Sequence, residues 1–200
     1  MQKRIILNII GIIFLAFGIA AIVNVTLRSQ YEQVIWFCYI GLVIMGIATL
    51  KQNSFWLTSQ INILAFPLLF WSFDFIILIA TGNSIFGLTD YFLAEDFPLI
   101  SKIISIQHLF TIPLSIYALY LMKLKRNDAW KISFVQLTAL FFVTRIFTSS
   151  ESNLNCVYRS CFNFTLDFYP IAWFIAGSLM ILITNFIIVR FFKNGRRPKN

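Results

Sequence analysis

The chain has 200 residues, of which 59% are hydrophobic and 12% charged, and its formal net charge is +8. A soluble domain of this size has too little interior for so much apolar surface, which includes 23 phenylalanines, so a soluble fold is excluded. The composition predicts a protein whose solvent is lipid.

Six apolar runs are long enough to cross a bilayer, because at about 1.5 Å per residue each covers most or all of a core about 30 Å thick. In chain order they are Ile5–Leu27, Val34–Leu50, Phe55–Thr81, Ile103–Met122, Trp130–Thr148 and Tyr169–Phe192. The first is too long for a signal peptide, so we interpret it as a membrane helix. Residues 1–200 are therefore expected to form a single all-α domain with six transmembrane helices.

The basic residues are distributed unequally between the two sides of these helices. Twelve lie on the side of the termini, namely Lys3, Arg4, Lys51, Lys123, Lys125, Arg126, Lys131, Arg190, Lys193, Arg196, Arg197 and Lys199. The other side has Arg28, Lys102, Arg145 and Arg159, together with six of the eight acidic residues. The positive-inside rule predicts both termini in the cytoplasm and a multi-pass protein of the cell membrane. Because the charge follows this topology, nucleic acid is not an expected partner.

The three cysteines divide between two environments. Cys156 and Cys161 lie in the outer loop Ser149–Asp167, where a disulfide can persist; we expect one there, with two free thiols as the alternative. Their spacing supplies too few ligands for a metal site and argues against a thiol–disulfide enzyme. No metal or other cofactor is expected. Cys38 lies inside the second predicted helix.

Polar residues of the membrane helices collect in one layer near the outer side. The second and fourth helices run inward, so Cys38 and His108, the one histidine of the chain, lie about 7–9 Å below the outer surface. Asp74 lies about 10 Å from the same surface, and Arg145 is near the outer end of its helix. An ionisable group inside the membrane indicates a functional site with a partner.

A thiol, an imidazole and a carboxylate at similar depth are the groups that covalent acyl transfer needs. In this interpretation Cys38 attacks an acyl ester, His108 is the general base and then the acid, and Asp74 orients His108. Arg145 or Arg159 would bind a lipid phosphate or carboxylate.

Each of these residues also has a structural interpretation. Cys38 can be a small buried apolar side chain, and His108 can hydrogen-bond to a neighbouring helix. Asp74 and Arg145 can form an ion pair that holds two helices together.

Several short segments resemble the androgen-induced family of membrane hydrolases, which cleave fatty acid esters of hydroxy fatty acids with a threonine and a histidine inside the membrane. The segments are Phe37–Ile44, Leu64–Pro67, Phe97-Pro98 followed by His108 and Pro113, and Tyr169-Pro170. The resemblance implies that Cys38 takes the place of the family's threonine and that His108 is the family's histidine. A related family of membrane acyltransferases acting on phospholipids is similar in using a cysteine with a histidine.

Two functions are therefore expected from the sequence. The first is an intramembrane lipid hydrolase or acyltransferase, with membrane lipids as partners and its site near the outer leaflet. The alternative is a non-enzymatic membrane protein, either a small transporter or a lipid-binding or partner subunit, in which His108, Asp74 and Arg145 form a structural network. Titratable groups on one side only argue against transport. The oligomeric state stays open.

Overall fold

The computed structural model describes residues 1–162 and 166–194, with side chains to Phe192. The α-helices are α1 (Gln2–Leu27), α2 (Phe37–Leu50), α3 (Ser54–Thr81), α4 (Leu99–Ser105), α5 (Gln107–Met122), α6 (Ala129–Phe147) and α7 (Tyr169–Asn194). Three short 3-10 turns are η1 (Tyr31–Ile35), η2 (Asp90–Phe92) and η3 (Leu154–Cys156). No strand occurs among these residues, which confirms the all-α prediction. The end of the basic tail, residues 195–200, lies outside the described residues.

Among the described residues, five stretches are long and apolar enough to cross a membrane: Gln2–Leu27, Ser54–Thr81, Leu99–Met122, Ala129–Phe147 and Tyr169–Phe192. The remaining predicted run, Val34–Leu50, forms α2, which has 14 residues and is therefore only about 21 Å long. It begins later than predicted because Val34 and Ile35 belong to η1, and Trp36 has an extended ψ of 121°. The length and apolar composition of these helices are consistent with a multi-pass membrane protein.

Local signals explain where the longest helix begins and ends. The side chain of Asn53 accepts a hydrogen bond from the Trp56 amide at 3.3 Å and so caps the start of α3. The helix ends at Gly82, whose φ of +77° is accessible without strain only to glycine. The stretch Leu99–Met122 is divided at Ile106 into α4 and α5, although Ile106 itself has helical φ and ψ.

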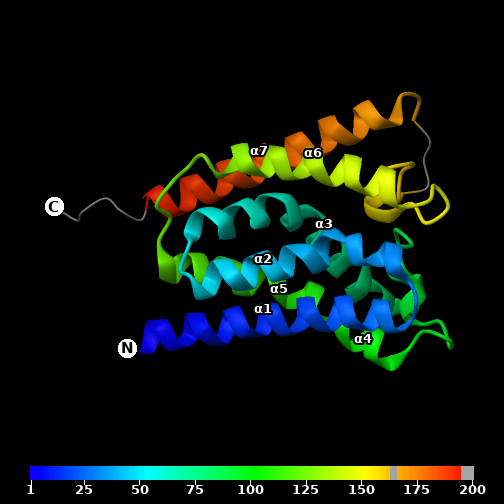
Figure 1. Ribbon diagram of the computed structural model, residues 1–200, viewed down its shortest axis with the longest axis horizontal. Coiled ribbons are helices and arrows are strands. Elements are labelled where there is room, and N and C mark those ends of the chain that lie inside the picture. The colour runs from blue at the N-terminus through cyan, green and yellow to red at the C-terminus, as the bar shows by residue number, and fades with distance from the viewer. Residues whose placement is uncertain (163–165, 195–200) are drawn as a thin grey trace.

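The helices lie side by side with their long axes in nearly the same direction (Figure 1). The start of α1 and the last turn of α7 lie at one end of the bundle, which we call the terminal end. The connections α1–α2 and α3–α4, and the described parts of the connection α6–α7, lie at the other end, which we call the loop end. Because α2 and α5 begin at the loop end, their first residues meet the loops there.

Candidate active site

Cys38 is the second residue of α2 and lies half-buried at the loop end. The start of α2 is held by a loop far away in sequence. The Phe37 amide donates to Asn155 Oδ1 at 3.0 Å, and Asn155 Nδ2 donates to the Ile35 carbonyl at 3.1 Å. The same Nδ2 group lies 3.0 Å from Thr144 Oγ1 of α6. Asn155 therefore sets the position of the first turn of α2, and with it that of Cys38.

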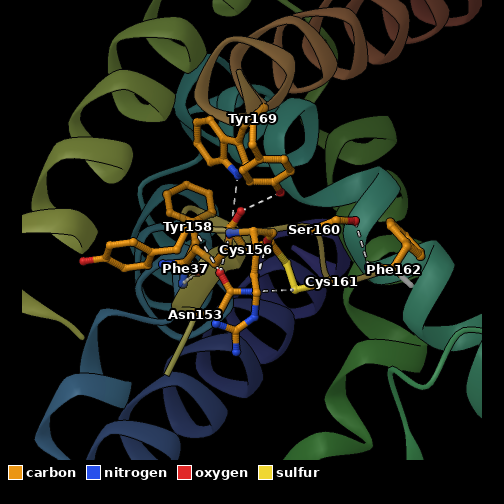
Figure 2. The surroundings of a disulfide bond; sticks show 11 residues. Phe37, Asn153, Cys156, Tyr158, Ser160, Cys161, Phe162 and Tyr169 are labelled. Atoms are coloured by element: carbon orange, nitrogen blue, oxygen red, sulfur yellow. Dashed lines mark hydrogen bonds between the residues drawn. A yellow bond between two sulfur atoms is a disulfide. The ribbon is translucent and has the colours of Figure 1, made fainter. Parts of the chain in front are cut away.

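The loop that carries Asn155 contains a disulfide between Cys156 and Cys161, as the sequence predicts (Figure 2). Inside the loop, Asn153 Oδ1 accepts hydrogen bonds from the amides of Tyr158 and Arg159. The Tyr169 hydroxyl donates to the Cys156 carbonyl at 2.7 Å and ties the loop to the start of α7.

Replacing Cys156 and Cys161 together by serine is expected to lower the free energy of unfolding by about 2 kcal/mol, the chain-entropy value for so short a loop. The amide of Phe37 should exchange faster with solvent because its acceptor, Asn155, is released. Unfolding in detergent, measured with and without reductant, checks the first expectation. The wild type should respond to reductant and the double variant should not; equal stability of all four samples would contradict it.

His108 is the second residue of α5, and the preceding turn fixes its ring. Its Nδ1 lies 2.6 Å from the Ser105 carbonyl oxygen. The imidazole stacks on the indole of Trp71 with ring centroids 4.5 Å apart, and the hydroxyl of Ser72 donates to the His108 carbonyl at 3.1 Å. Because a carbonyl oxygen only accepts, the neutral ring carries its proton on Nδ1 and has a lone pair on Nε2.

A hydroxyl from the loop between α3 and α4 completes this cluster. Trp71 Nε1 donates to the Tyr91 hydroxyl at 2.9 Å, and that hydroxyl lies 3.4 Å from Ser105 Oγ. Burial raises the pKa of Tyr91, although its hydrogen bonds with Ser105 and Trp71 act in the opposite direction. Cys38 directly precedes Tyr39, and Tyr39 and Ser105 line one small cavity, so Cys38 and His108 both adjoin this cavity. They are not hydrogen-bonded to each other within the described structure, as is common for a nucleophile and its base before substrate binds.

Asp74 is fully buried and is bonded to the loop between α3 and α4, not to His108. Its two carboxylate oxygens accept five hydrogen bonds at 2.7–3.1 Å, from the amides of Ile85, Phe86, Leu88 and Thr89 and from the Thr89 hydroxyl. In the described part of the chain, the contact that holds the His108 ring by Nδ1 comes from Ser105.

Arg145 and Arg159 are both exposed, and the guanidinium of each contacts other groups of the chain. The Arg145 guanidinium lies 5.0 Å from the ring centre of Phe141 and 5.1 Å from that of Tyr158. The ion pair between Asp74 and Arg145, one of the structural interpretations, is therefore wrong: among the described residues the ion pair is Arg126–Asp128. Arg159 donates to the carbonyls of its own loop.

A second polar cluster lies deeper in the bundle and joins α3 to α6 and α7. Asn62 Nδ2 donates to Ser133 Oγ and to Asn185 Oδ1, each at 3.3 Å, and Gln60 Nε2 donates to Gln136 Oε1 at 3.1 Å. Hydrogen bonds of this kind hold transmembrane helices together. We assign this cluster a structural role.

Three residues of the site escaped the sequence analysis. Ser105 precedes His108 by three residues, one helical turn, so this spacing could have indicated a contact. Tyr91 and Asn155 lie in loops, and no local pattern marks a loop side chain that reaches a distant helix. Within the described residues, no group of three or more His, Cys, Asp or Glu side chains is placed to hold a metal ion.

No family model, curated protein or solved structure matches this chain. The resemblance to the androgen-induced family consequently rests on the short segments named above, and the function has to be argued from the site.

Proposed function

We propose that this chain is an intramembrane lipid hydrolase or acyltransferase in which Cys38 is the nucleophile and His108 the general base. The observation that carries the proposal is the hydrogen bond between His108 Nδ1 and the Ser105 carbonyl. It leaves Nε2 as the one proton acceptor of the ring, which is the state that a general base requires.

The surroundings of His108 favour the same role. The stacked Trp71 restricts the ring plane, and Ser105 replaces Asp74 as the group that orients the imidazole. Cys38 is the one cysteine outside the disulfide, and it directly precedes Tyr39, which lines one small cavity together with Ser105. The nucleophile and the base thus border one small group of side chains.

The reaction would run in two steps. Nε2 of His108 takes the thiol proton of Cys38, the sulfur attacks the ester carbonyl carbon, and the C–O bond breaks while Nε2 returns the proton to the leaving alkoxide. Water, or the hydroxyl of an acceptor lipid, then attacks the thioester with His108 again as base. The products are a free acid or a new ester, and the thiol is restored.

We infer that the chain crosses the membrane six times, with the terminal end in the cytoplasm and the site near the outer leaflet. The start of α1 and the last turn of α7 lie at the same end of the bundle, which requires an even number of crossings. Basic residues collect at that end, as the positive-inside rule demands. The disulfide at the loop end favours an oxidising compartment there.

Labelling with a long-chain β-lactone, which transfers its acyl group to an activated thiol, tests the proposal. We expect one adduct per chain, on Cys38, with none in Cys38→Ala. His108→Asn should label at least about a hundredfold more slowly, because a general base contributes about 10²–10⁴ to the rate.

The asparagine variant separates the two roles of His108. Its Nδ2 can still donate to the Ser105 carbonyl, but it has no group that takes a proton near neutral pH. A purely structural histidine would therefore be replaced well by asparagine and poorly by alanine. Unchanged labelling in His108→Asn would overturn the catalytic role and favour the non-enzymatic membrane protein.

A further inference from the structure

We propose that a cavity between the loop ends of α1 and α4 binds the anionic oxygens of an acidic lipid, with Arg28 as the cationic group. The inference rests on the proposed function, because it names the class of lipid that the site would accept: one with a carboxylate or a phosphate group.

The cavity has a volume of about 30 Å³. This is room for about two water-sized groups, which matches two oxygens of a carboxylate or phosphate. Arg28 and Asn24 line it from the end of α1, Ser101 from α4 and Tyr39 from α2. None of its lining residues is acidic.

Two hydrogen-bond donors converge on one hydroxyl oxygen in this cavity. Arg28 Nη1 donates to Ser101 Oγ at 3.2 Å, and Asn24 Nδ2 donates to the same oxygen at 3.0 Å. Both lone pairs of the buried Ser101 hydroxyl are thereby used, while its own hydrogen has no acceptor among the described residues. That hydrogen, the second amide hydrogen of Asn24 and the other guanidinium hydrogens of Arg28 are all available to an anion.

Arg28 is distinguished from the other basic residues of the loop end. Like Lys102, Arg145 and Arg159 it forms no ion pair in the described chain, but it is the basic residue that lines the cavity. Lys102 donates to the Ala94 carbonyl, and Arg145 lies against two aromatic rings. A guanidinium that borders a donor-rich cavity suits a carboxylate or phosphate, which it can bind through two parallel hydrogen bonds.

The cavity adjoins the proposed catalytic group. Ser105 lines the cavity, and its carbonyl oxygen is the one that holds His108. Tyr39, which also lines it, directly follows Cys38. A lipid anchored there by its anionic group would therefore have its acyl ester close to the nucleophile and the base.

Lipid binding by the full chain in nanodiscs of dioleoyl phosphatidylcholine tests this site, with oleate and dioleoyl phosphatidate as the titrated probes. We expect one bound acidic lipid per chain and about tenfold weaker binding in Arg28→Gln, the loss of one charge-assisted contact. Arg28→Lys should lose less, because it keeps the charge. Tighter binding of oleate would identify a carboxylate, and tighter binding of phosphatidate a phosphate.

Arg145→Gln is the matched control, because it removes the same charge from the same end of the bundle outside the cavity. Equal losses in Arg28→Gln and Arg145→Gln, or no loss in either, would overturn the inference. Arg28→Gln should keep the circular dichroism spectrum and the SDS unfolding curve of the wild type, which shows that it is folded. Since binding needs no chemistry, failure of the Cys38 and His108 variants to change labelling would disprove the proposed function without removing the Arg28-dependent binding.

Discussion

Replacing Asp74 with alanine is expected to lower the free energy of unfolding by about 3–5 kcal/mol, a loss typical of a broken buried network. Five donors converge on this one carboxylate, four of them backbone amides between Ile85 and Thr89. Without it, these amides at the loop end of the bundle lose their acceptor. Unfolding in lipid or mild detergent measures the loss, and hydrogen exchange of Ile85, Phe86, Leu88 and Thr89 should accelerate together.

Asp74→Asn is the more informative variant because its shape is almost the same. The amide oxygen can still accept from Ile85 and Phe86, but the NH₂ group would face the amides of Leu88 and Thr89, donor against donor. We therefore expect asparagine to destabilise nearly as much as alanine. Asp90→Asn is the control, because exposed Asp90 accepts from the Ser84 hydroxyl of the same loop and should lose less than about 1 kcal/mol. Stability of Asp74→Asn equal to the wild type would show that the loop does not depend on this carboxylate.

The loop held by Asp74 also supplies Tyr91 to the candidate site. Its position is secured further by aromatic contacts, since Phe92 packs on Phe75 with ring centroids 4.7 Å apart and Phe86 packs on Phe70 at 5.9 Å. Loss of the Asp74 contacts should therefore disturb the Trp71–Tyr91–Ser105 group as well as the loop. The Asp74 carboxylate therefore affects the site by holding the loop that carries Tyr91, without a direct contact with His108.

The existence of the helices could be predicted from the sequence, because long apolar runs have few stable alternatives in a membrane. The predicted run Phe55–Thr81 differs from α3 by one residue at its start, and Trp130–Thr148 differs from α6 by one residue at each end. The start of α2 was harder to predict from the sequence, because the 3-10 turn at Val34 and Ile35 is bonded to Asn155, which is more than a hundred residues away. The extension of α4 back to Leu99 was missed for a related reason: Lys102 interrupts the apolar pattern.

The candidate site could be predicted only in part. Cys38 and His108 were found from their chemistry and their depth, and both lie in the first turn of a helix at the loop end. The partners of Asp74 could not be found, because they are backbone amides, which every residue has. The cavity beside Arg28 forms where the end of α1 meets α4, and these segments are more than seventy residues apart in the sequence. From the sequence alone, Arg28 was one of four basic residues on the outer side of the predicted helices, with no assigned role.

The close packing of α1 against α2 leads to a second large effect, at Gly46. A Cβ at this position would lie 2.5 Å from Leu15 Cγ and 2.9 Å from both the Gly11 carbonyl oxygen and the Leu15 amide nitrogen. Two of these atoms belong to the backbone of α1, so the helices must move apart to admit a side chain. Small residues at such interfaces let transmembrane helices approach closely.

Gly46→Ala is therefore expected to lower the free energy of unfolding by about 2 kcal/mol, within the range for overpacking, although alanine is the better helix former by about 1 kcal/mol. Gly46→Leu should cost more and separate α1 from α2. Because α2 carries Cys38 and α1 carries Arg28, the separation should also weaken both acyl labelling and binding of acidic lipids. Unfolding by SDS titration, followed by circular dichroism, measures the stability of each variant.

Gly177→Ala in α7 is the matched control for Gly46→Ala. Its added Cβ would also meet an atom at 2.9 Å, but this atom is Leu137 Cδ2, the far end of a flexible side chain. Leu137 can rotate away, so the gain in helix propensity should roughly offset the contact and leave stability within about 1 kcal/mol of the wild type. Equal losses at Gly46 and Gly177 would mean that any added methyl group is harmful, and equal tolerance would mean that α1 and α2 can separate without cost. A loss at Gly46 alone would locate the constraint in the backbone contact between these two helices, on which the positions of Cys38 and Arg28 both depend.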